Sequence, residues 1–489
     1  MAQAPATPIN DIPALEAAFA RIHAASRRQI AVDATVRRRR LDGLFALLHD
    51  HREAIGEAVS ADFGHRSRHE TRLLEVFPTL EAIRHARRHF KGWMQPRRRP
   101  ASLWFLPGRA EVRPQPVGCV GVVVPWNYPV FLALAPLAGA FAAGNRALVK
   151  MSEFTPATAA LLAGVAPRYF AADELAIVEG DAAVARAFVR LPFDHLLFTG
   201  STAVGREVMK AAAENLTPVT LELGGKSPAL VAPGYPLAKA AERILVGKCM
   251  NAGQTCIAPD YVLLPAGQED AFVAAARATV AACYPDLVRN PDYTAIVNDR
   301  HYARLAGYLA DARAQGAQVA ELLPGVPADP ASRRLPPVLV LGASDRLRVM
   351  QEEIFGPILP VVTYHNVDEA VATINGHDRP LALYLFDHDG ARVRRLLDTT
   401  VAGGVTVNDT ILHIAQDSLP FGGIGPSGMG HYHGHEGFLT FSKLKPVFHQ
   451  SRLNGMGLFK PPYGRLFDRL VKVLLLLPAA AASSRPAWP

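Results

Sequence analysis

One cysteine, Cys256, stands among small and polar residues in the stretch Asn251–Asp260. Gly253 lets the backbone approach a ligand closely, and Pro259 prevents a helix from running on through this stretch. We therefore expect the thiol on a loop or at the end of an element, where positioned and exposed cysteines are reactive. For a lone cysteine, burial as a small apolar side chain is the more frequent role.

A carboxylate, Glu222, lies between two leucines and directly before the pair Gly224-Gly225. Partly apolar surroundings raise the pKa of a carboxyl group, and such a group can act as a general base near neutral pH. The alternative is a carboxylate on the rim of a site, paired with Lys226.

A third candidate, Asn127, is enclosed by prolines in the sequence Pro125-Trp126-Asn127-Tyr128-Pro129. Because prolines fix the backbone on both sides, the side-chain amide would be held rigidly, as the stabilisation of an oxyanion requires. A purely structural turn is the commoner role for such a sequence.

Two further stretches follow expected strands and could bind a dinucleotide. Phe198–Gly205 contains Gly200 and Gly205, which do not form a G-x-G-x-x-G motif, but it opens a helix whose first amides would face a phosphate. Lys150 and Glu153 could bind ribose hydroxyls, with the acidic group favouring NAD over NADP, or could be two exposed charges. The glycine-rich segments 351–357 and 419–428 are rigid and could also be ordinary loops.

Short apolar runs alternate with helical segments from Val117 onward. This alternation predicts α/β architecture with parallel, doubly wound sheets, in which ligands bind at the carboxyl ends of the strands. Expected strands of the first half are 120–124, 147–150, 177–179, 195–198 and 219–221. In the second half we expect strands at 261–264, 338–340, 359–362, 383–386 and 405–407, helices at 237–250, 268–283 and 299–315, and a loop at 323–337.

Helices are also expected near both ends of the chain. Residues 12–62 predict two helices, the first capped by Asp11, and residues 70–94 continue helically. The proline-rich segment Pro96–Pro107 then leads into an edge strand or arm. Residues 463–477 predict a basic amphipathic helix, too short to span a bilayer, which needs roughly 20 residues. Docking on the protein or on a partner subunit is favoured over contact with a membrane surface, and 479–489 is expected to be disordered.

Composition sets outer limits on the function. A chain of 489 residues is too long for one core, so two or more domains are expected. Four scattered cysteines without a C-x-x-C pair argue against a disulfide framework and a zinc site, and they suit a reducing cytosol. The first residues lack the pattern of a signal peptide, which favours a cytoplasmic location.

The net charge of +8 raises the question of nucleic-acid binding. The arginine clusters 37–40 and 97–99 are not interleaved with aromatic residues or glycines, and no nucleic-acid motif accompanies them. A solvated basic face, which could attract an anionic dinucleotide, explains them better.

Together these segments resemble the aldehyde dehydrogenase superfamily over roughly residues 15–450. Six motifs occur in the family's order: 125–129, 198–201, 222–226, 253–256, 353–357 and 420–423. The spacing of 34 residues between Glu222 and Cys256, and the sequence Cys256–Tyr261, are similar to the class 3 branch. Within that branch, Asn408–His413 and Gly430–Glu436 are most similar to coniferyl-aldehyde dehydrogenases.

The resemblance implies a role for each matching residue. Cys256 would attack the aldehyde, Asn127 and the Cys256 amide would hold the oxyanion, and Glu222 would activate the water that hydrolyses the thioester. The cofactor would be NAD, with NADP also possible, and no metal would be needed. Its ligands would be Lys150 and Glu153 at the adenosine ribose, Gly200, Ser201 and Gly205 near the pyrophosphate, and Glu353 and Phe355 at the nicotinamide ribose and ring.

The resemblance also implies an organisation into parts. A Rossmann-like NAD-binding domain would comprise 1–98 and 117–222, and a second α/β domain, 223–425, would carry the nucleophile. A small β element for bridging and oligomerisation would comprise 99–116 and 426–455, followed by the C-terminal helix and tail, 456–489. The expected assembly is a homodimer, with the histidine-rich stretch 431–435 packed or on the surface near its interface.

The substrate stays open between an aromatic or cinnamyl aldehyde, such as coniferyl aldehyde, and a medium- or long-chain aliphatic aldehyde. An acylating enzyme that passes the thioester to coenzyme A is a further alternative, against which Glu222 argues, because that branch commonly lacks this base. A non-catalytic protein that retains the fold is disfavoured, because both the nucleophile and the base are present.

Overall fold

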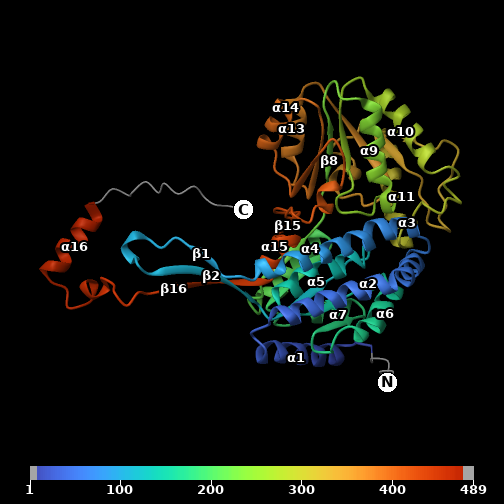
Figure 1. Ribbon diagram of the computed structural model, residues 1–489. Helices are drawn as coiled ribbons and strands as arrows, with labels where there is room; N and C mark the ends of the chain where they lie inside the picture. Colours follow the sequence, from blue (N-terminus) through green and yellow to red (C-terminus); the bar gives the residue numbers. More distant parts are fainter. Residues whose placement is uncertain (1–7, 477–489) are drawn as a thin grey trace. The chain divides into compact units, whose positions relative to one another are not determined.

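The structure is a computed structural model that describes residues 8–476, so the disorder expected for 479–489 lies outside the described residues. The chain forms two compact units (Figure 1). The first comprises the residues up to Trp93 and Gln115–Lys443, and the second comprises Met94–Pro114 and the residues from Leu444 onward.

The first unit contains a six-stranded sheet in the order β15-β7-β6-β3-β4-β5. Five of its strands run parallel, and only the two-residue edge strand β15 is antiparallel. This order confirms the predicted doubly wound, Rossmann-like sheet. The strands are β3 (Cys119–Val123), β4 (Arg146–Lys150), β5 (Leu175–Val178), β6 (His195–Thr199), β7 (Val219–Glu222) and β15 (Gly428–Met429).

Helices cover both faces of this sheet because its strands are apolar on both sides. Leu15 and Ile22 of the first helix pack in one core with Leu148 and Leu196 of the strands. The predicted N-cap is confirmed, since the Asp11 carboxylate accepts a hydrogen bond from an amide of the first turn. These helices are α1 (Ile12–Arg28), α5 (Phe131–Ala143), α6 (Pro156–Val165), η3 (Ala166–Arg168), α7 (Ala182–Phe188) and α8 (Thr202–Ala213).

A layer of N-terminal helices packs on α5. The predicted second helix is present, whereas the segment expected to continue helically from residue 70 contains one π-helical stretch, η1. A π-helical turn re-aims side chains, and here Glu75 is fully buried within it. The helices of this layer are α2 (Ala34–Phe63), α3 (Arg68–Thr71), η1 (Arg72–Val76), α4 (Phe77–Trp93) and α15 (Gly434–Thr440).

A seven-stranded sheet, in the order β10-β11-β12-β9-β8-β13-β14, forms the other half of the first unit. All its strands are parallel except the edge strand β10. The strands are β8 (Pro228–Val231), β9 (Tyr261–Pro265), β10 (Gln318–Glu321), β11 (Val338–Leu341), β12 (Ile358–Tyr364), β13 (Ala382–Phe386) and β14 (Gly404–Val407).

Helices flank this second sheet on both sides; in Figure 1, α9 and α10 lie on one side of β8, and α13 and α14 lie on the other. The sequence analysis did not identify β8, β10, α13 or α14. β8 has only four residues and begins at a proline, and the edge strand β10 also has only four residues, with a glutamine and a glutamate at its ends. The helical segments are α9 (Leu237–Cys249), η4 (Met250–Gly253), α10 (Glu269–Cys283), α11 (Asp299–Ala314), α12 (Arg348–Gln351), α13 (Val367–Gly376), α14 (Gly390–Thr399) and η5 (Leu412–Ala415).

The second unit is built on a three-stranded sheet in the order β1-β2-β16. The segment after the proline-rich stretch forms strand β2, but the expected edge position is wrong, because β2 is the central strand and pairs on both sides. Its elements are β1 (Arg97–Arg99), η2 (Leu103–Phe105), β2 (Arg109–Pro116), β16 (Ser442–His449), η6 (Met456–Phe459) and α16 (Arg465–Leu476). α16 is the predicted C-terminal helix, and none of its residues is buried. Within residues 8–476, no helix combines the length and the apolar character needed to cross a membrane.

Candidate active site

A cavity of about 970 Å³ in the first unit brings together residues from both of its sheets. Thr199–Ala203 follow β6, Glu222 ends β7, and Trp126 and Asn127 follow β3. Cys256 lies on the same wall, shortly before β9. The cavity thus opens where the parallel strands of the first sheet end, as the predicted topology requires.

The turn that carries Cys256 has an unusual backbone. Asn251, Ala252 and Gly253 all adopt positive φ angles, of 52°, 51° and 76°. Residues other than glycine are strained in this backbone conformation. A Cβ atom on Gly253 would also overlap the carbonyl group of Gly356, so only glycine fits this position.

Hydrogen bonds connect this turn to Asn127. The Asn127 side-chain amide donates to the carbonyl oxygen of Gln254 over 3.2 Å, and the Asn251 amide donates to the Asn127 carbonyl oxygen over 3.1 Å. The hydroxyl groups of Tyr128 and Thr255 are also hydrogen-bonded, at 2.6 Å. Asn127 and the cysteine turn therefore form one connected structure, and both line the cavity.

Cys256 is half-buried, and its pKa is raised to about 12. Burial is the largest cause, and the negative charges of Glu353 and Glu222 add to it. Hydrogen bonds from the backbone amides of Cys256 and Ile257 act in the opposite direction, because they stabilise a negative charge at the sulfur. The site therefore offers amide donors to an anion at this position.

Glu222 is only 2% exposed, and neither of its carboxylate oxygens has a hydrogen-bond partner. Burial raises the pKa of this carboxyl group well above its ordinary value. The alternative of a rim carboxylate paired with Lys226 is wrong, because Lys226 instead forms an ion pair with Asp260. Glu222 has the environment that the sequence predicted for a general base.

The residues predicted near a pyrophosphate lie at the start of α8. Gly200 and Ser201 line the cavity, and the Ser201 hydroxyl caps the helix by accepting from the Val204 amide. Gly205 is not among the lining residues; it is buried where a Cβ would clash with Leu223, so it allows α8 to pack closely beneath β7.

The residues predicted at the nicotinamide end come from the segment after α12. Glu353 and Phe355 both line the cavity. Glu353 accepts from the Gly225 amide, one of its oxygens has no partner, and its pKa is raised to about 8, chiefly by burial. Phe355 has a positive φ of 51° and packs its ring against Trp126 at 5.3 Å.

Lys150 and Glu153 lie apart from this cavity. The Lys150 ammonium group is buried and donates to the carbonyl oxygens of Met151, at 2.6 Å, and Gly180, at 2.8 Å. Glu153 is exposed and lines a neighbouring cavity of about 420 Å³, together with Phe154 and Asp62. The structure thus does not place these two side chains on the wall that carries Cys256.

Buried charges that the sequence analysis missed support the Asn127 turn. Arg66 and Glu75 form a fully buried ion pair at 2.8 Å, and Arg66 also donates to the Asn127 carbonyl oxygen at 3.0 Å. The second Glu75 oxygen accepts from the amides of Val130 and Phe131. In the sequence Arg66 lies in the break between two expected helices and Glu75 lies in a helical segment rich in arginine, so nothing distinguishes them from exposed charges.

The histidine-rich stretch 431–435 divides between surface and core. His431 is exposed, His433 is 7% exposed, and the His435 ring lies 5.6 Å from the ring of Trp93. Among the described residues, no group of three or more His, Cys, Asp or Glu side chains is placed to hold a metal ion.

The cavity fits a dinucleotide cofactor. It is large, it is lined by the first residues of a twelve-residue helix, and that helix end presents amides to a phosphate. An unpaired Glu353 oxygen on the same wall can accept from a ribose hydroxyl. These features agree with the predicted roles of Gly200, Ser201 and Glu353.

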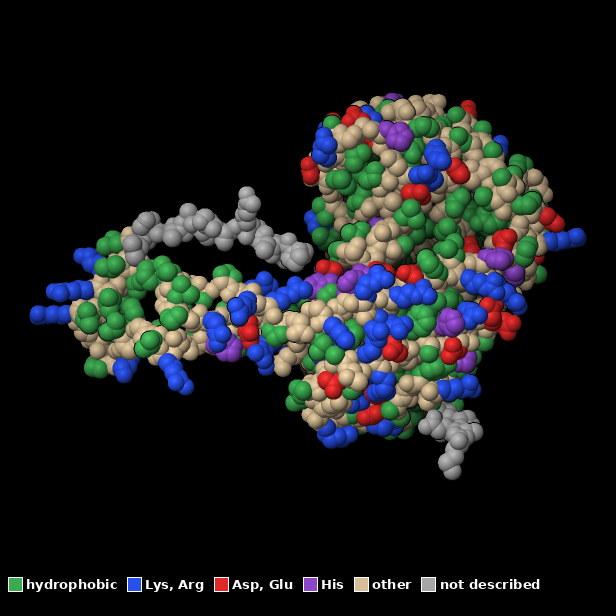
Figure 2. All heavy atoms as spheres, viewed as in Figure 1, with side chains coloured by type: hydrophobic (Ala, Val, Ile, Leu, Met, Phe, Trp, Pro, Cys, Tyr) green, Lys and Arg blue, Asp and Glu red, His purple; other side chains and the backbone are tan. Residues whose placement is uncertain are grey.

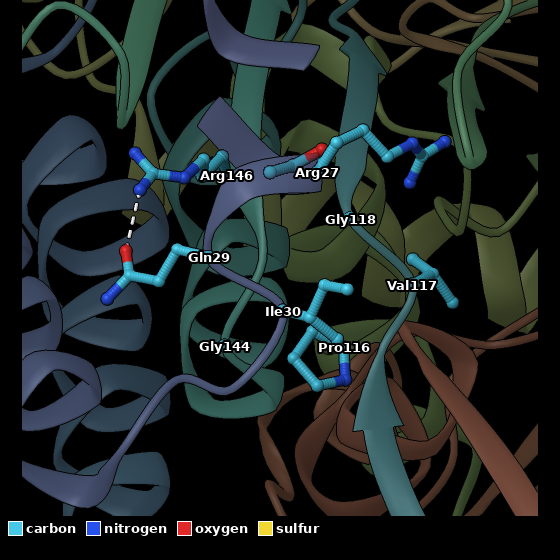
Figure 3. A pocket seen from close by; sticks show the side chains of 9 residues that line it. Arg27, Gln29, Ile30, Pro116, Val117, Gly118, Gly144 and Arg146 are labelled. Atoms are coloured by element: carbon cyan, nitrogen blue, oxygen red, sulfur yellow. Dashed lines mark hydrogen bonds between the residues drawn. The ribbon is translucent and has the colours of Figure 1, made fainter. Parts of the chain in front are cut away.

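Two other features of the surface are less suited to binding or catalysis. A separate cavity of about 180 Å³ contains Arg27 and Arg146, but Arg27 pairs with Asp194, and Arg146 pairs with Asp173 and bonds Gln29 (Figure 3). Figure 2 shows Lys and Arg side chains spread over the visible face and interspersed with acidic ones, which agrees with a solvated basic surface.

Comparison with known proteins identifies the family. Residues 7–447 match the model of the aldehyde dehydrogenase family. The chain is 54% identical over 466 residues to the probable coniferyl aldehyde dehydrogenase of Pseudomonas aeruginosa, covering 95% of this chain and 97% of that protein.

Solved structures agree. The substrate-bound state of Staphylococcus aureus AldH matches with a TM-score of 0.88 and 37% identity, covering 94% of this chain and 99% of that one. A Mycobacterium tuberculosis aldehyde dehydrogenase complexed with NAD⁺ matches with a TM-score of 0.81 and 28% identity, covering 90% and 91%. The chain belongs to the aldehyde dehydrogenase family and is an NAD(P)-dependent oxidoreductase that acts on aldehydes.

Proposed function

We propose that this enzyme oxidises an aryl or cinnamyl aldehyde, such as coniferyl aldehyde, to the carboxylic acid. The observation that carries the proposal is that Cys256, Glu222 and Asn127 line one cavity, together with a helix end suited to a cofactor phosphate. The aromatic preference is supported by the name of the Pseudomonas aeruginosa relative, a probable coniferyl aldehyde dehydrogenase. It is also supported by buried Tyr128 and Tyr384, whose hydroxyls bond Thr255 and Ile257, on either side of Cys256.

In this proposal Cys256 is the nucleophile. Its neutral thiol passes a proton to the Glu222 carboxylate, which exchanges one buried negative charge for another. The amides of Cys256 and Ile257 stabilise the resulting thiolate. Attack of the sulfur on the carbonyl carbon gives a thiohemiacetal, whose oxyanion is held by the Asn127 amide and the Cys256 backbone N–H.

A bound NAD(P) would supply the acceptor for the hydride of the thiohemiacetal carbon, which leaves a thioester on Cys256. Glu222 releases the proton that it took from the thiol to solvent, and its carboxylate then removes a proton from the water molecule that attacks this thioester. The carbon–sulfur bond breaks, and the carboxylic acid leaves. The proposed cofactor ligands are Gly200 and Ser201, with Gly205 shaping the helix beneath them, Glu353 and Phe355 at the nicotinamide end, and Lys150 and Glu153 at the adenosine ribose.

The domain organisation is a second part of the proposal. Residues 1–98 and 117–222 form the NAD-binding domain, 223–425 the catalytic domain, and 99–116 with 426–455 the bridging element, followed by the C-terminal segment 456–489. We propose a homodimer and a cytoplasmic location. All four cysteines are free, which suits a reducing compartment.

A panel of coniferyl aldehyde, benzaldehyde, a medium-chain aliphatic aldehyde and a semialdehyde, each with NAD and with NADP, tests the substrate class. We expect the highest kcat/KM with the cinnamyl aldehyde. A marked preference for the aliphatic aldehyde would overturn the aromatic assignment. Product analysis with and without coenzyme A tests the hydrolytic step, since formation of acyl-CoA only when coenzyme A is added would replace it with acyl transfer.

A further inference from the structure

One carboxylate outside the cavity contacts the turn that leads to Cys256. Glu70 lies in the short helix α3, is half-buried, and is not among the residues that line the cavity. Both of its carboxylate oxygens accept from the backbone amide of Asn251, at 3.1 Å each, and one of them also accepts from the Thr294 hydroxyl group at 2.7 Å. The proposed reaction steps do not use this side chain.

The amide that Glu70 binds belongs to the strained part of the turn. Asn251 and Ala252 have positive φ angles of 52° and 51°. Residues other than glycine keep this conformation only where surrounding contacts hold it. Glu70 supplies such a contact from a segment far away in the sequence, and a hydrogen bond to a charged acceptor is stronger than one to a neutral acceptor.

The Asn251 side chain connects Glu70 to the two catalytic segments. Its amide donates to the carbonyl oxygens of Asn127 and Gln254, at 3.1 Å each. The Gln254 carbonyl oxygen also accepts from the Asn127 side-chain amide, at 3.2 Å, and Gln254 lies two residues before Cys256. The orientation of the Asn127 amide and the position of the thiol therefore both depend on Asn251.

A second side chain from the same segment binds the Asn127 turn. Arg66, four residues before Glu70, donates to the Asn127 carbonyl oxygen at 3.0 Å. Burial raises the pKa of the Glu70 carboxyl group, and the positive charge of Arg66 opposes this rise. The arginine thus favours the carboxylate form, in which both oxygens of Glu70 are acceptors.

We propose that Glu70 is a positioning residue, which holds the Asn251 turn in the conformation that lets Cys256 and the Asn127 amide act on the same carbonyl group. The inference rests on the proposed roles of Cys256 and Asn127, and it adds a residue that acts on them from outside the cavity. Because a nucleophile and an oxyanion donor must be placed accurately, a small displacement of either lowers kcat. Substitution of Glu70 should therefore lower kcat more than it changes the KM for the aldehyde.

A purely structural role for Glu70 predicts a different result, and Glu174 provides the matched control. Glu174 is also a carboxylate of the first unit, is only 4% exposed, and pairs with Arg39 and Arg40. It is not among the residues that line the cavity. Glu174→Gln should therefore lower the thermal unfolding midpoint and leave kcat unchanged.

The test measures kcat, the KM for coniferyl aldehyde and the Kd for NAD in the parent, Glu70→Ala, Glu70→Gln and Glu174→Gln. We expect Glu70→Ala to lower kcat by about tenfold or more, with KM and Kd within about twofold of the parent. Glu70→Gln retains an oxygen that can accept from the Asn251 amide, so it should recover most of this loss. Protection of the buried Cys119 from alkylation checks that each variant stays folded.

Glu70→Asp distinguishes the reach of the side chain from its charge, and it keeps the test decisive if Glu70→Ala does not fold. Aspartate keeps the negative charge near Arg66 but is one methylene shorter, so its contact with Asn251 is lost and its kcat should be below that of Glu70→Gln. The reverse order would overturn the inference. Parental kcat in Glu70→Ala, or equal losses of kcat in Glu70→Gln and Glu174→Gln, would overturn it as well. Turnover of Cys256→Ser at the parent's rate would instead refute the proposed nucleophile itself.

Discussion

At the scale of residues, the catalytic chemistry depends on two acids whose protonated forms are favoured by burial. The Cys256 thiol has its pKa raised to about 12, and the Glu222 carboxyl group also has its pKa raised, in each case chiefly by burial. The negative charge of Glu222 adds to the raised pKa of the Cys256 thiol, so the site disfavours negative charges on both groups at once. This coupling suits a proton that moves between the two groups during the reaction.

Cys256→Ser should abolish aldehyde oxidation, with a fall in kcat/KM of at least about 10³-fold, because a serine hydroxyl in this environment is a far weaker nucleophile. The substitution is nearly isosteric, so the thermal unfolding midpoint should change little. Steady-state assays with coniferyl aldehyde and NAD, together with a thermal melt, measure both effects. Turnover at the parent's rate would exclude Cys256 as the nucleophile.

Glu222→Gln should change how stability depends on pH and should lower kcat. A carboxyl group whose pKa is raised on folding stabilises the fold most below its unfolded pKa, and this contribution is lost as the pH rises toward the folded pKa. A glutamine does not titrate, so the variant does not lose this stability as the pH rises. The stability of the variant relative to that of the parent should therefore increase from pH 5 to pH 8. Thermal melts at both values measure it, and kcat should fall strongly at both. A constant difference in stability across this range would contradict a buried, titrating carboxylate.

At the scale of elements, the amino-acid pattern predicted most of the fold, because buried parallel strands are continuous apolar runs. The sequence analysis identified the five parallel strands of the first sheet. It missed β8, which is short and begins at a proline, and β10, a four-residue edge strand with a polar residue at each end. Burial of Arg66, Glu75 and His433 was not predictable in the same way, since it depends on contacts between distant segments.

The site was predictable to a similar extent. Glu222, Asn127, Gly200 and Ser201 meet at one cavity because each ends or follows a strand, and Cys256 joins them from the turn before β9. Whether an ionisable side chain forms an ion pair could not be predicted from its neighbours in the sequence, because the partner can come from a distant segment. The possible pair of Glu222 with Lys226 fails because Asp260, from another segment, is the partner of that lysine.

Gly253→Ala tests the turn that aims Cys256. Both the positive φ of 76° and the close carbonyl of Gly356 oppose a Cβ atom here, so the free energy of unfolding should fall by about 2 kcal/mol or more. kcat should fall as well, because the thiol is displaced. Denaturant unfolding and steady-state kinetics measure the two effects.

Gly267→Ala is the matched control, because Gly267 has a positive φ of 84° but no atom near the added Cβ. It should show the backbone strain alone, about 1 kcal/mol, with full activity. Equal losses of stability and activity in the two variants would mean that contact with Gly356 is unimportant.

At the scale of the whole molecule, the first unit contains the residues of the candidate active site, whereas most residues of the second unit lie at the surface. Its sheet has three strands, and both outer strands, β1 and β16, are edges that could pair with another chain. Four consecutive apolar residues, Leu103–Leu106, are 43–70% exposed. An exposed apolar run beside strand edges is typical of an interface between subunits.

The proposed homodimer predicts a mass in solution of about twice 52.7 kDa. Trp104 is 56% exposed within the apolar run, and large aromatic residues often dominate the energetics of such contacts. Trp104→Glu should therefore shift the enzyme toward the monomer in analytical ultracentrifugation. Leu216→Glu provides the control, because Leu216 is an isolated apolar residue of the first unit that is 89% exposed, and its replacement should leave the mass unchanged. Because the cavity around Cys256 is lined by residues of the first unit alone, monomeric Trp104→Glu should still oxidise aldehydes. A parent that sediments as a monomer would refute the dimer, and a variant that stays dimeric would place the interface elsewhere.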